Sequence, residues 1–244
     1  MKSETLNIGN IKEVQEKLST IIGISGHEED VSNFILNEIE SNNLADEAWI
    51  DNLGNVLAIK RGMDSNSRIL LDAHIDEIGF MISHIEKNGF LRFVLIGAWD
   101  TRILLGQSVI LKSKTGEIFY GIIGSKPPHL TTLKERKKQV EIPNMYIDLG
   151  FISEEEVQDN DINVGTVGTL FSPFTEFPNG MVKGKAFDDR TGCNVILQVM
   201  KLLKEEKPKE TLLFNFAAQE EVGGRVAITG AHSLKPTIAL AIEN

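Results

Sequence analysis

The residues best suited to chemistry are one histidine and several carboxylates that stand at the ends of apolar segments. They are His74 and Asp76 in LLDAHIDEIG, Asp188 with Asp189, Glu220 with Glu221, and Glu243. Carboxylates crowded together without counter-charge repel one another and raise one another's pKa values. A divalent cation relieves that repulsion, and imidazole with carboxylate ligands suits zinc, cobalt or manganese better than calcium or magnesium. If these segments converge in the fold, they predict a metal site.

Each group also has a purely structural interpretation. Asp188 is placed to cap a helix, and an isolated histidine such as His74 is more often a hydrogen-bonded core residue than a ligand. A glutamate pair at a strand end is often solvated, and Glu243 stands next to last, where chain ends tend to be poorly ordered. The metal-site interpretation is favoured because the same pattern recurs at several strand ends. Glu77 stays unassigned, and an exposed position is expected for it.

The elements that would position these residues indicate an α/β domain. Helical spacing fills the first forty residues, and segments 67–79 and 210–224 predict apolar strands of a sheet covered on both faces. Segment 188–207 predicts a helix, and 237–244 predicts a last strand. The apolar stripe of the helix is expected at Val195, Ile196, Val199, Leu202 and Leu203. In open α/β sheets ligands gather outside the carboxyl ends of the strands, so the acidic groups should meet there.

Residues 77–175 show a different pattern, with short strands and little helix between them. Two hairpin turns are expected, at residues 87–89 and 115–116. Such a run indicates a small barrel or sandwich set into the α/β chain. We therefore expect a discontinuous domain of residues 1–76 and 176–244 around an insert of residues 77–175.

The composition excludes several classes of partner. The 244 residues carry a formal net charge of −10, which argues against nucleic acid or an anionic membrane as a partner. Cys193 is the only cysteine, so the chain forms no internal disulfide and fits a reducing compartment. The N-terminus has no apolar signal core, and no run approaches about 18 apolar residues. A soluble, cytoplasmic protein is expected.

Four segments of this sequence resemble the signature segments of the tetrahedral metalloaminopeptidase family, which includes glutamyl and deblocking aminopeptidases and members labelled cellulase M. They are LLDAHIDEIGFMI, GIIGSKPPHL, GKAFDDRTGC and AAQEEVGGRVA. They occur in family order with family-like spacing, and the likeness runs from about residue 14 to the end. The resemblance implies a three-layer peptidase domain with a mixed sheet, truncated at its C-terminus, and an inserted barrel-like β-domain that serves homo-oligomer assembly.

The resemblance also implies roles for single residues. The implied metal ligands are His74, Asp188, Glu221 and Glu243. The implied catalytic residues are Glu220, as general base, and Asp76, which would orient His74 from behind. The implied reaction releases N-terminal amino acids from peptides through attack of a metal-bound water whose proton Glu220 takes.

In the family, two divalent ions (Zn, Co or Mn) fill a complete site, and a second histidine ligand lies beyond the strand that here ends at Glu243. This sequence stops at Asn244, so the second ion lacks a ligand and an impaired activity is expected. One alternative is a non-catalytic or degenerate assembly subunit of the same family. A glucanase is a further alternative, but paired glycosidase carboxylates need no histidine ligand such as His74, and only Trp49 and Trp99 are available to stack on a sugar.

Overall fold

The computed structural model describes residues 8–134 and 137–243, and the chain divides into two compact units. Unit 1 comprises Met1–Glu77 and Pro173–Asn244, and unit 2 comprises Ile78–Ser172. The divisions predicted from the sequence lie after residues 76 and 175. Among the described residues, no helix has both the length and the apolar character that a membrane span requires.

Unit 1 is built on a mixed five-stranded sheet with the strand order β1-β2-β12-β3-β13. Its strands are β1 (Glu47–Ile50), β2 (Val56–Lys60), β3 (Asp64–His74), β12 (Glu210–Ala217) and β13 (Ile238–Ala241). Strands β12 and β13 each pair with β3 in parallel, whereas β2 pairs antiparallel with both β1 and β12. The three parallel strands therefore end at the same edge of the sheet.

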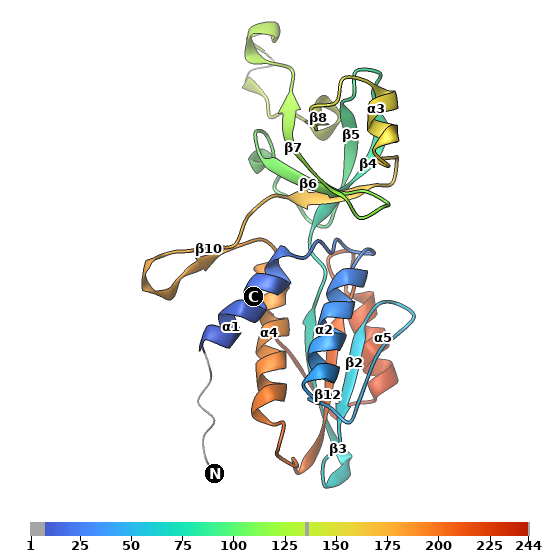
Figure 1. Cartoon of the computed structure of the whole chain (residues 1–244), viewed down its shortest axis with the longest axis vertical. Helices are drawn as coiled ribbons and strands as arrows, with labels where there is room; N and C mark the ends of the chain where they lie inside the picture. The colour runs from blue at the N-terminus through green and yellow to red at the C-terminus, as the bar shows by residue number, and fades with distance from the viewer. Residues whose placement is uncertain (1–7, 135–136, 244) are drawn as a thin grey trace. The chain divides into compact units, whose positions relative to one another are not determined.

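Helices cover both faces of this sheet, which makes three layers (Figure 1). The helices are α1 (Ile8–Thr20), α2 (Glu29–Ser41), α4 (Phe187–Leu202) and α5 (Arg225–Leu234). Successive side chains of a strand point to opposite faces, so Phe214 and Phe216 of β12 join the core beneath α1, α2 and α4, while Leu213 packs with Leu234 of α5. The three-layer α/β prediction is confirmed.

The buried face of α4 differs from the predicted stripe. Val195 and Leu202 are 44% and 39% exposed, whereas Cys193, Ile196 and Met200 are fully buried. The buried positions follow the i, i+3, i+7 spacing that starts at Cys193, two residues before the first expected position, Val195. The prediction was right for Ile196 and wrong for Val195 and Leu202, because Cys193 and Met200 are buried on this face instead.

Unit 2 is a closed six-stranded barrel with the strand order β4-β5-β8-β7-β6-β9. Its elements are β4 (Gly79–Ile85), β5 (Leu91–Ile96), β6 (Ser108–Lys112), β7 (Ile118–Ser125), β8 (Met145–Asp148), α3 (Glu154–Asp159) and β9 (Val167–Leu170). Inward-facing apolar side chains such as Phe80, Leu111 and Ile147 fill the barrel. Closure removes the free strand edges that an open sheet would expose. The barrel-like prediction for this part of the chain is confirmed.

The remaining elements are short. In unit 1, β10 (Thr175–Glu176) and β11 (Val182–Lys183) form a two-stranded ribbon. Turns of 3-10 helix occupy Thr101–Ile103, Pro128–Leu130, Ile142–Asn144 and Pro178–Gly180.

Candidate metal centre

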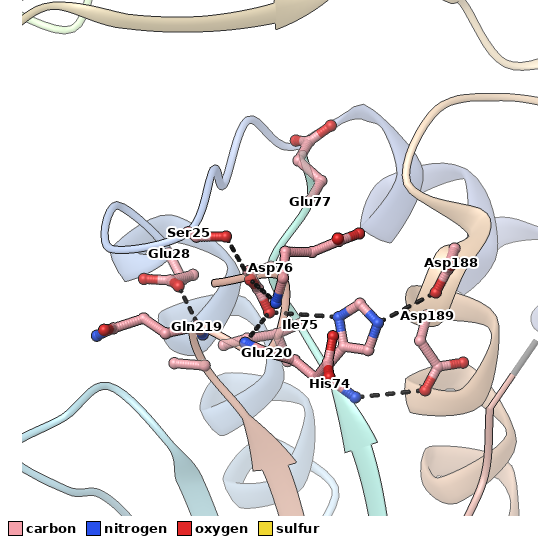
Figure 2. Close-up of polar contacts among 12 residues, drawn as sticks. Ser25, Glu28, His74, Ile75, Asp76, Glu77, Asp188, Asp189, Gln219 and Glu220 are labelled. Carbon is pink, nitrogen blue, oxygen red and sulfur yellow. Dashed lines mark hydrogen bonds and ion pairs between the residues drawn. The ribbon is translucent and has the colours of Figure 1, made fainter. Parts of the chain in front are cut away.

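His74 is the last residue of β3 and lies at the edge where the parallel strands end. Its imidazole is 3% exposed. Nδ1 lies 3.3 Å from Asp76 Oδ1, and Nε2 lies 3.1 Å from Asp188 Oδ1 and 3.6 Å from Glu243 Oε1 (Figure 2 shows the first two contacts). One ring nitrogen therefore faces a buried carboxylate, and the other faces two carboxylates that are more than half exposed.

The electrostatics of this cluster show an excess of negative charge. Burial by itself lowers the pKa of His74, but the carboxylates of Asp76, Asp189 and Glu243 outweigh it and raise the pKa to about 9. Burial, reinforced by Glu243, raises the pKa of Asp189 to about 7. A bound cation would oppose both shifts, because it would stabilise the ionised carboxylates and the neutral imidazole.

A similar shift marks the glutamate pair that follows β12. Burial raises the pKa of Glu221 to about 6, and the nearby carboxylates of Asp76, Asp188 and Glu220 contribute to the rise. Glu221 thus shares the electrostatic environment of His74, although it comes from a different strand end. The structure brings Asp76, Asp188 and Glu243 within 4 Å of the His74 ring, and it ties Glu220 and Glu221 to this group through the bonds of their backbone amides to Asp76.

The donor set fits a divalent transition metal. One ligand atom each from His74, Asp189 and Glu243 lie within 4.8 Å of one another. Imidazole nitrogen with carboxylate oxygen is the ligand combination of zinc and of its neighbours in the first transition row. The chemistry of the donors therefore matches the sequence prediction, but with an aspartate that was not assigned as a ligand.

Asp188 and Asp189 share the site in different ways. Asp188 approaches Nε2 of His74 with a side chain that is 61% exposed, whereas Asp189 is fully buried. The backbone amide of His74 donates to Asp189 Oδ2 at 3.3 Å, and the amide of Gly192 donates to Oδ1 at 3.2 Å. The peptide bond between the two aspartates is cis. Two adjacent aspartates have the same residue type, so the sequence offered no signal that distinguished them.

Asp76 holds the turn that carries Glu220 and Glu221. Its Oδ1 accepts the amide of Glu220 at 2.9 Å, and its Oδ2 accepts the amide of Glu221 at 3.1 Å and the hydroxyl of Ser25 at 2.5 Å (Figure 2). Burial raises the pKa of Asp76, but the contact with His74 and these hydrogen bonds outweigh it, and the pKa is lowered. Asp76 thus stays ionised and links the end of β3 to the end of β12.

A buried ion cluster lies next to the site and was missed by the sequence analysis. Arg190 is fully buried and donates to the carbonyl of Ile75 at 2.8 Å and to Glu77 Oε1 at 3.3 Å. Lys185 Nζ donates to the same Glu77 oxygen at 2.6 Å and to the carbonyl of Ile21 at 2.7 Å. Glu77 is 3% exposed, so the expectation of an exposed position was wrong. Its charge is buried because two cations from the segment before and within α4 neutralise it.

Cys193 takes no part as a nucleophile. Its thiol is buried and donates to the carbonyl of His74 at 3.1 Å. Burial raises its pKa well above the usual value, so the thiolate is disfavoured.

Known proteins resemble this chain along nearly its whole length. A putative aminopeptidase of Acetivibrio thermocellus is 36% identical over 228 residues, which are 93% of this chain and 64% of that protein. The chain spans only 62% to 65% of the length of four curated relatives.

Two solved peptidase structures have the same fold as this chain. The TET aminopeptidase from a marine sediment Thaumarchaeota archaeon has a TM-score of 0.91 at 39% identity, over 96% of this chain and 66% of that one. The TET1 peptidase of Pyrococcus horikoshii, which can assemble into a tetrahedron or a large octahedral shell, has a TM-score of 0.85 at 33% identity, over 96% of this chain and 68% of that one. The model of the M42 glutamyl aminopeptidase family matches residues 54–244, most of the chain. The chain therefore belongs to the M42 glutamyl aminopeptidase family.

Proposed function

We propose that this chain acts as a metal-dependent aminopeptidase that releases N-terminal residues from peptides. The observation that carries the proposal is the convergence of His74 Nε2 with carboxylate oxygens of Asp188 and Glu243, which come from three different segments of unit 1. Family membership supports the reaction class. The raised pKa values of His74, Asp189 and Glu221 support a cation at this place.

The proposed ligands are the four that the resemblance implies, with Asp189 as a further candidate. They are His74, Asp188, Glu221 and Glu243. Divalent ions held there would polarise the scissile carbonyl and anchor a free α-amino group, as zinc, cobalt or manganese can. Asp76 would hold His74 through Nδ1, so that Nε2 faces the ion.

Glu220 is the proposed general base. It lies in the turn after β12, where its backbone amide donates to Asp76 Oδ1 at 2.9 Å. Glu220 would take a proton from the attacking water and deliver it to the amine that leaves. A substrate with a blocked α-amino group would lack the group that the ions anchor, so cleavage would be confined to free N-termini.

We also propose that unit 2 mediates self-association. The side chains of Ile118, Tyr120 and Ile122 alternate along β7 and are 39%, 61% and 48% exposed, so they form an apolar stripe on the outside of the barrel. The ring of Phe171 packs edge-on against Tyr120 at 5.1 Å and widens this stripe. Contiguous exposed apolar surface of this kind marks interaction sites, and the TET1 relative assembles into closed shells.

The test of the activity combines metal content with turnover. The purified chain is analysed by mass spectrometry for bound metal and assayed on a panel of aminoacyl p-nitroanilides with added zinc, cobalt or manganese. Glu220→Gln should lower turnover by about 10²–10⁴-fold with the metal retained, whereas His74→Ala should lose both. His232→Ala, an exposed histidine of α5, serves as the matched control.

Three results would contradict the proposal. An assembled wild-type protein without metal or turnover would favour the non-catalytic subunit. Equal turnover of N-acetylated and free substrates would exclude an aminopeptidase, and hydrolysis of a glucan in place of peptides would favour the glucanase.

A further inference from the structure

The backbone that follows β12 is held by side chains from elsewhere in unit 1 and not by a neighbouring strand. The amides of residues 218–221 donate, in order, to Asn55 Oδ1 at 3.0 Å, Glu28 Oε1 at 3.0 Å, Asp76 Oδ1 at 2.9 Å and Asp76 Oδ2 at 3.1 Å. Four successive amides thus have side-chain acceptors. Figure 2 shows the bonds from Glu28 and Asp76 to this turn.

These amides need side-chain acceptors because the backbone leaves the sheet after β12. Strand β12 ends at Ala217, the last residue in register with β3, and Gln219 has a φ of 56°. A residue in the left-handed region leaves the ladder, so its amide and the next ones lose their strand partners. Buried backbone amides without partners are costly. The conformation of the turn therefore depends on where the three acceptor side chains lie.

Glu28 is a buried residue whose carboxylate accepts a backbone amide of the turn. It stands at the N-terminus of α2 and is 5% exposed, and its Oε1 accepts the amide of Gly26 at 2.7 Å as well as that of Gln219. Burial raises its pKa, while the two amide hydrogen bonds oppose the rise. A carboxylate in a buried position has to be compensated by such bonds.

Asn55 supplies the acceptor for the first amide of the turn, that of Ala218. It is fully buried directly before β2, and its Nδ2 donates to Asp51 Oδ2 at 2.8 Å and to the carbonyl of Val226 at 3.3 Å. These two bonds orient the amide group, so that Oδ1 faces the amide of Ala218. Asn55 therefore ties the turn both to its own loop and to the start of α5.

We infer that Glu28 and Asn55 are positioning residues that, with Asp76, hold Glu220 and Glu221 toward His74. The roles of these two glutamates rest on the proposed function. Glu28 and Asn55 reach the site only through the backbone of the turn that they bind. Loss of an acceptor would free the backbone of this turn. The carboxylates of Glu220 and Glu221 would then move away from the other ligands, while the rest of unit 1 stays folded.

The test compares Glu28→Ala with Glu28→Gln in the full-length chain. Glutamine keeps a carbonyl oxygen that can accept both amides, whereas alanine removes the acceptor. Glu28→Ala should speed hydrogen–deuterium exchange of peptides covering residues 217–224 by roughly tenfold and weaken Zn²⁺ binding by about 10–100-fold. Glu28→Gln should restore both. Asn55→Ala, a second variant in case Glu28→Ala does not fold, should raise exchange of the same turn.

Thr211→Val is the matched control. Thr211 is buried at the opposite end of β12, where its hydroxyl accepts the amide of Gly62 at 3.2 Å. This variant should lose stability without any change in exchange at the turn or in Zn²⁺ binding. Unchanged exchange of the turn in both Glu28→Ala and Asn55→Ala would overturn the inference, as would equal weakening of Zn²⁺ binding by Thr211→Val. A wild-type chain that binds no metal would overturn the proposed function instead, because the exchange measurement decides the positioning role by itself.

Discussion

Asp76 connects three parts of the site, because its carboxylate faces His74 Nδ1, accepts the Ser25 hydroxyl and accepts two amides of the turn at 220–221. In Asp76→Asn one oxygen becomes an NH₂ group, so at least one of these donors loses its acceptor. We expect the free energy of unfolding to fall by about 1–3 kcal/mol and the affinity for Zn²⁺ to fall by about 10–100-fold. Thermal denaturation and calorimetric titration measure the two effects.

Ser25→Ala provides the control for this prediction. It removes one hydroxyl bond to Asp76 and leaves the contacts with His74 and the turn in place. The expected cost is about 0.5–1.5 kcal/mol of stability, with Zn²⁺ affinity unchanged. If Asp76→Asn and Ser25→Ala weaken Zn²⁺ binding to the same extent, Asp76 does not hold the site in the way proposed.

Gly192 leaves room for the carboxylate of Asp189. A Cβ at this position would lie 2.6 Å from both carboxylate oxygens of Asp189, too close for any atom pair of this kind. Gly192→Ala should therefore displace Asp189 from the amide of His74 and lower both metal content and turnover. Metal analysis of the purified variant measures the first effect, and the p-nitroanilide assay measures the second.

A glycine in α5 makes a matched control for Gly192. A Cβ at Gly230 would lie 2.6 Å from Asn215 Nδ2, an equally close contact at the other face of the sheet. Gly230→Ala should cost a similar amount of stability but retain the metal. Loss of metal in both variants would mean that the effect of Gly192→Ala is general unfolding.

Residue types and spacing were enough to group His74 with Glu243 and with the pair Asp188 and Asp189, whereas the choice of Asp188 as the ligand came from the family resemblance. Asp189 was not assigned as a ligand, because the choice between adjacent aspartates depends on local backbone geometry. Glu77 was missed for a different reason. Its neutralising partners, Lys185 and Arg190, are more than a hundred positions away in the sequence.

At the scale of elements, the cluster of Glu77, Lys185 and Arg190 joins the end of β3 to the segment before α4. Burial lowers the pKa of Lys185 to about 8, although Glu77 opposes the change. Between about pH 8 and 10.5 the unfolded chain keeps a proton that the folded chain has released, so the free energy of unfolding rises with pH in this window. The full rise is roughly 3 kcal/mol for this one lysine.

Lys185→Met removes this titration and leaves Glu77 paired with Arg190. Its free energy of unfolding should therefore rise less than that of the wild type between about pH 8 and 10.5, as measured by urea denaturation at several pH values. Lys201→Met, which removes a half-buried lysine paired with Glu38, is the control. The same pH dependence in the wild type and in Lys185→Met would contradict the prediction.

The elements themselves were largely predictable, whereas the ends of the strands were not. Alternation and apolar runs indicate β3 and β12, because each must fill a core on both faces of the sheet. The end of β12 at Ala217 is decided by acceptors at Asn55 and Glu28, which lie more than 160 positions earlier in the sequence. Local periodicity carries no information about such distant partners.

For the whole molecule, the change from helical to alternating patterns near residue 77 was enough to predict a small β-insert, barrel or sandwich, in an α/β domain. Neither pattern contains the surface that we propose for self-association. That surface becomes visible only when the strands of unit 2 are paired, because pairing places Ile118, Tyr120 and Ile122 on one outer face of β7.

The prediction for the whole molecule concerns this apolar stripe. Tyr120→Lys puts a charge at its centre, and burial of that charge between two molecules would be costly. We expect the native mass, measured by light scattering and native mass spectrometry, to fall from an assembly to a smaller species. Ile152→Lys changes an isolated apolar residue of unit 2 that is 83% exposed, and it should leave the assembly intact. If Ile152→Lys dissociates the protein as fully as Tyr120→Lys does, or if neither variant changes the mass, the stripe on β7 is not the contact surface.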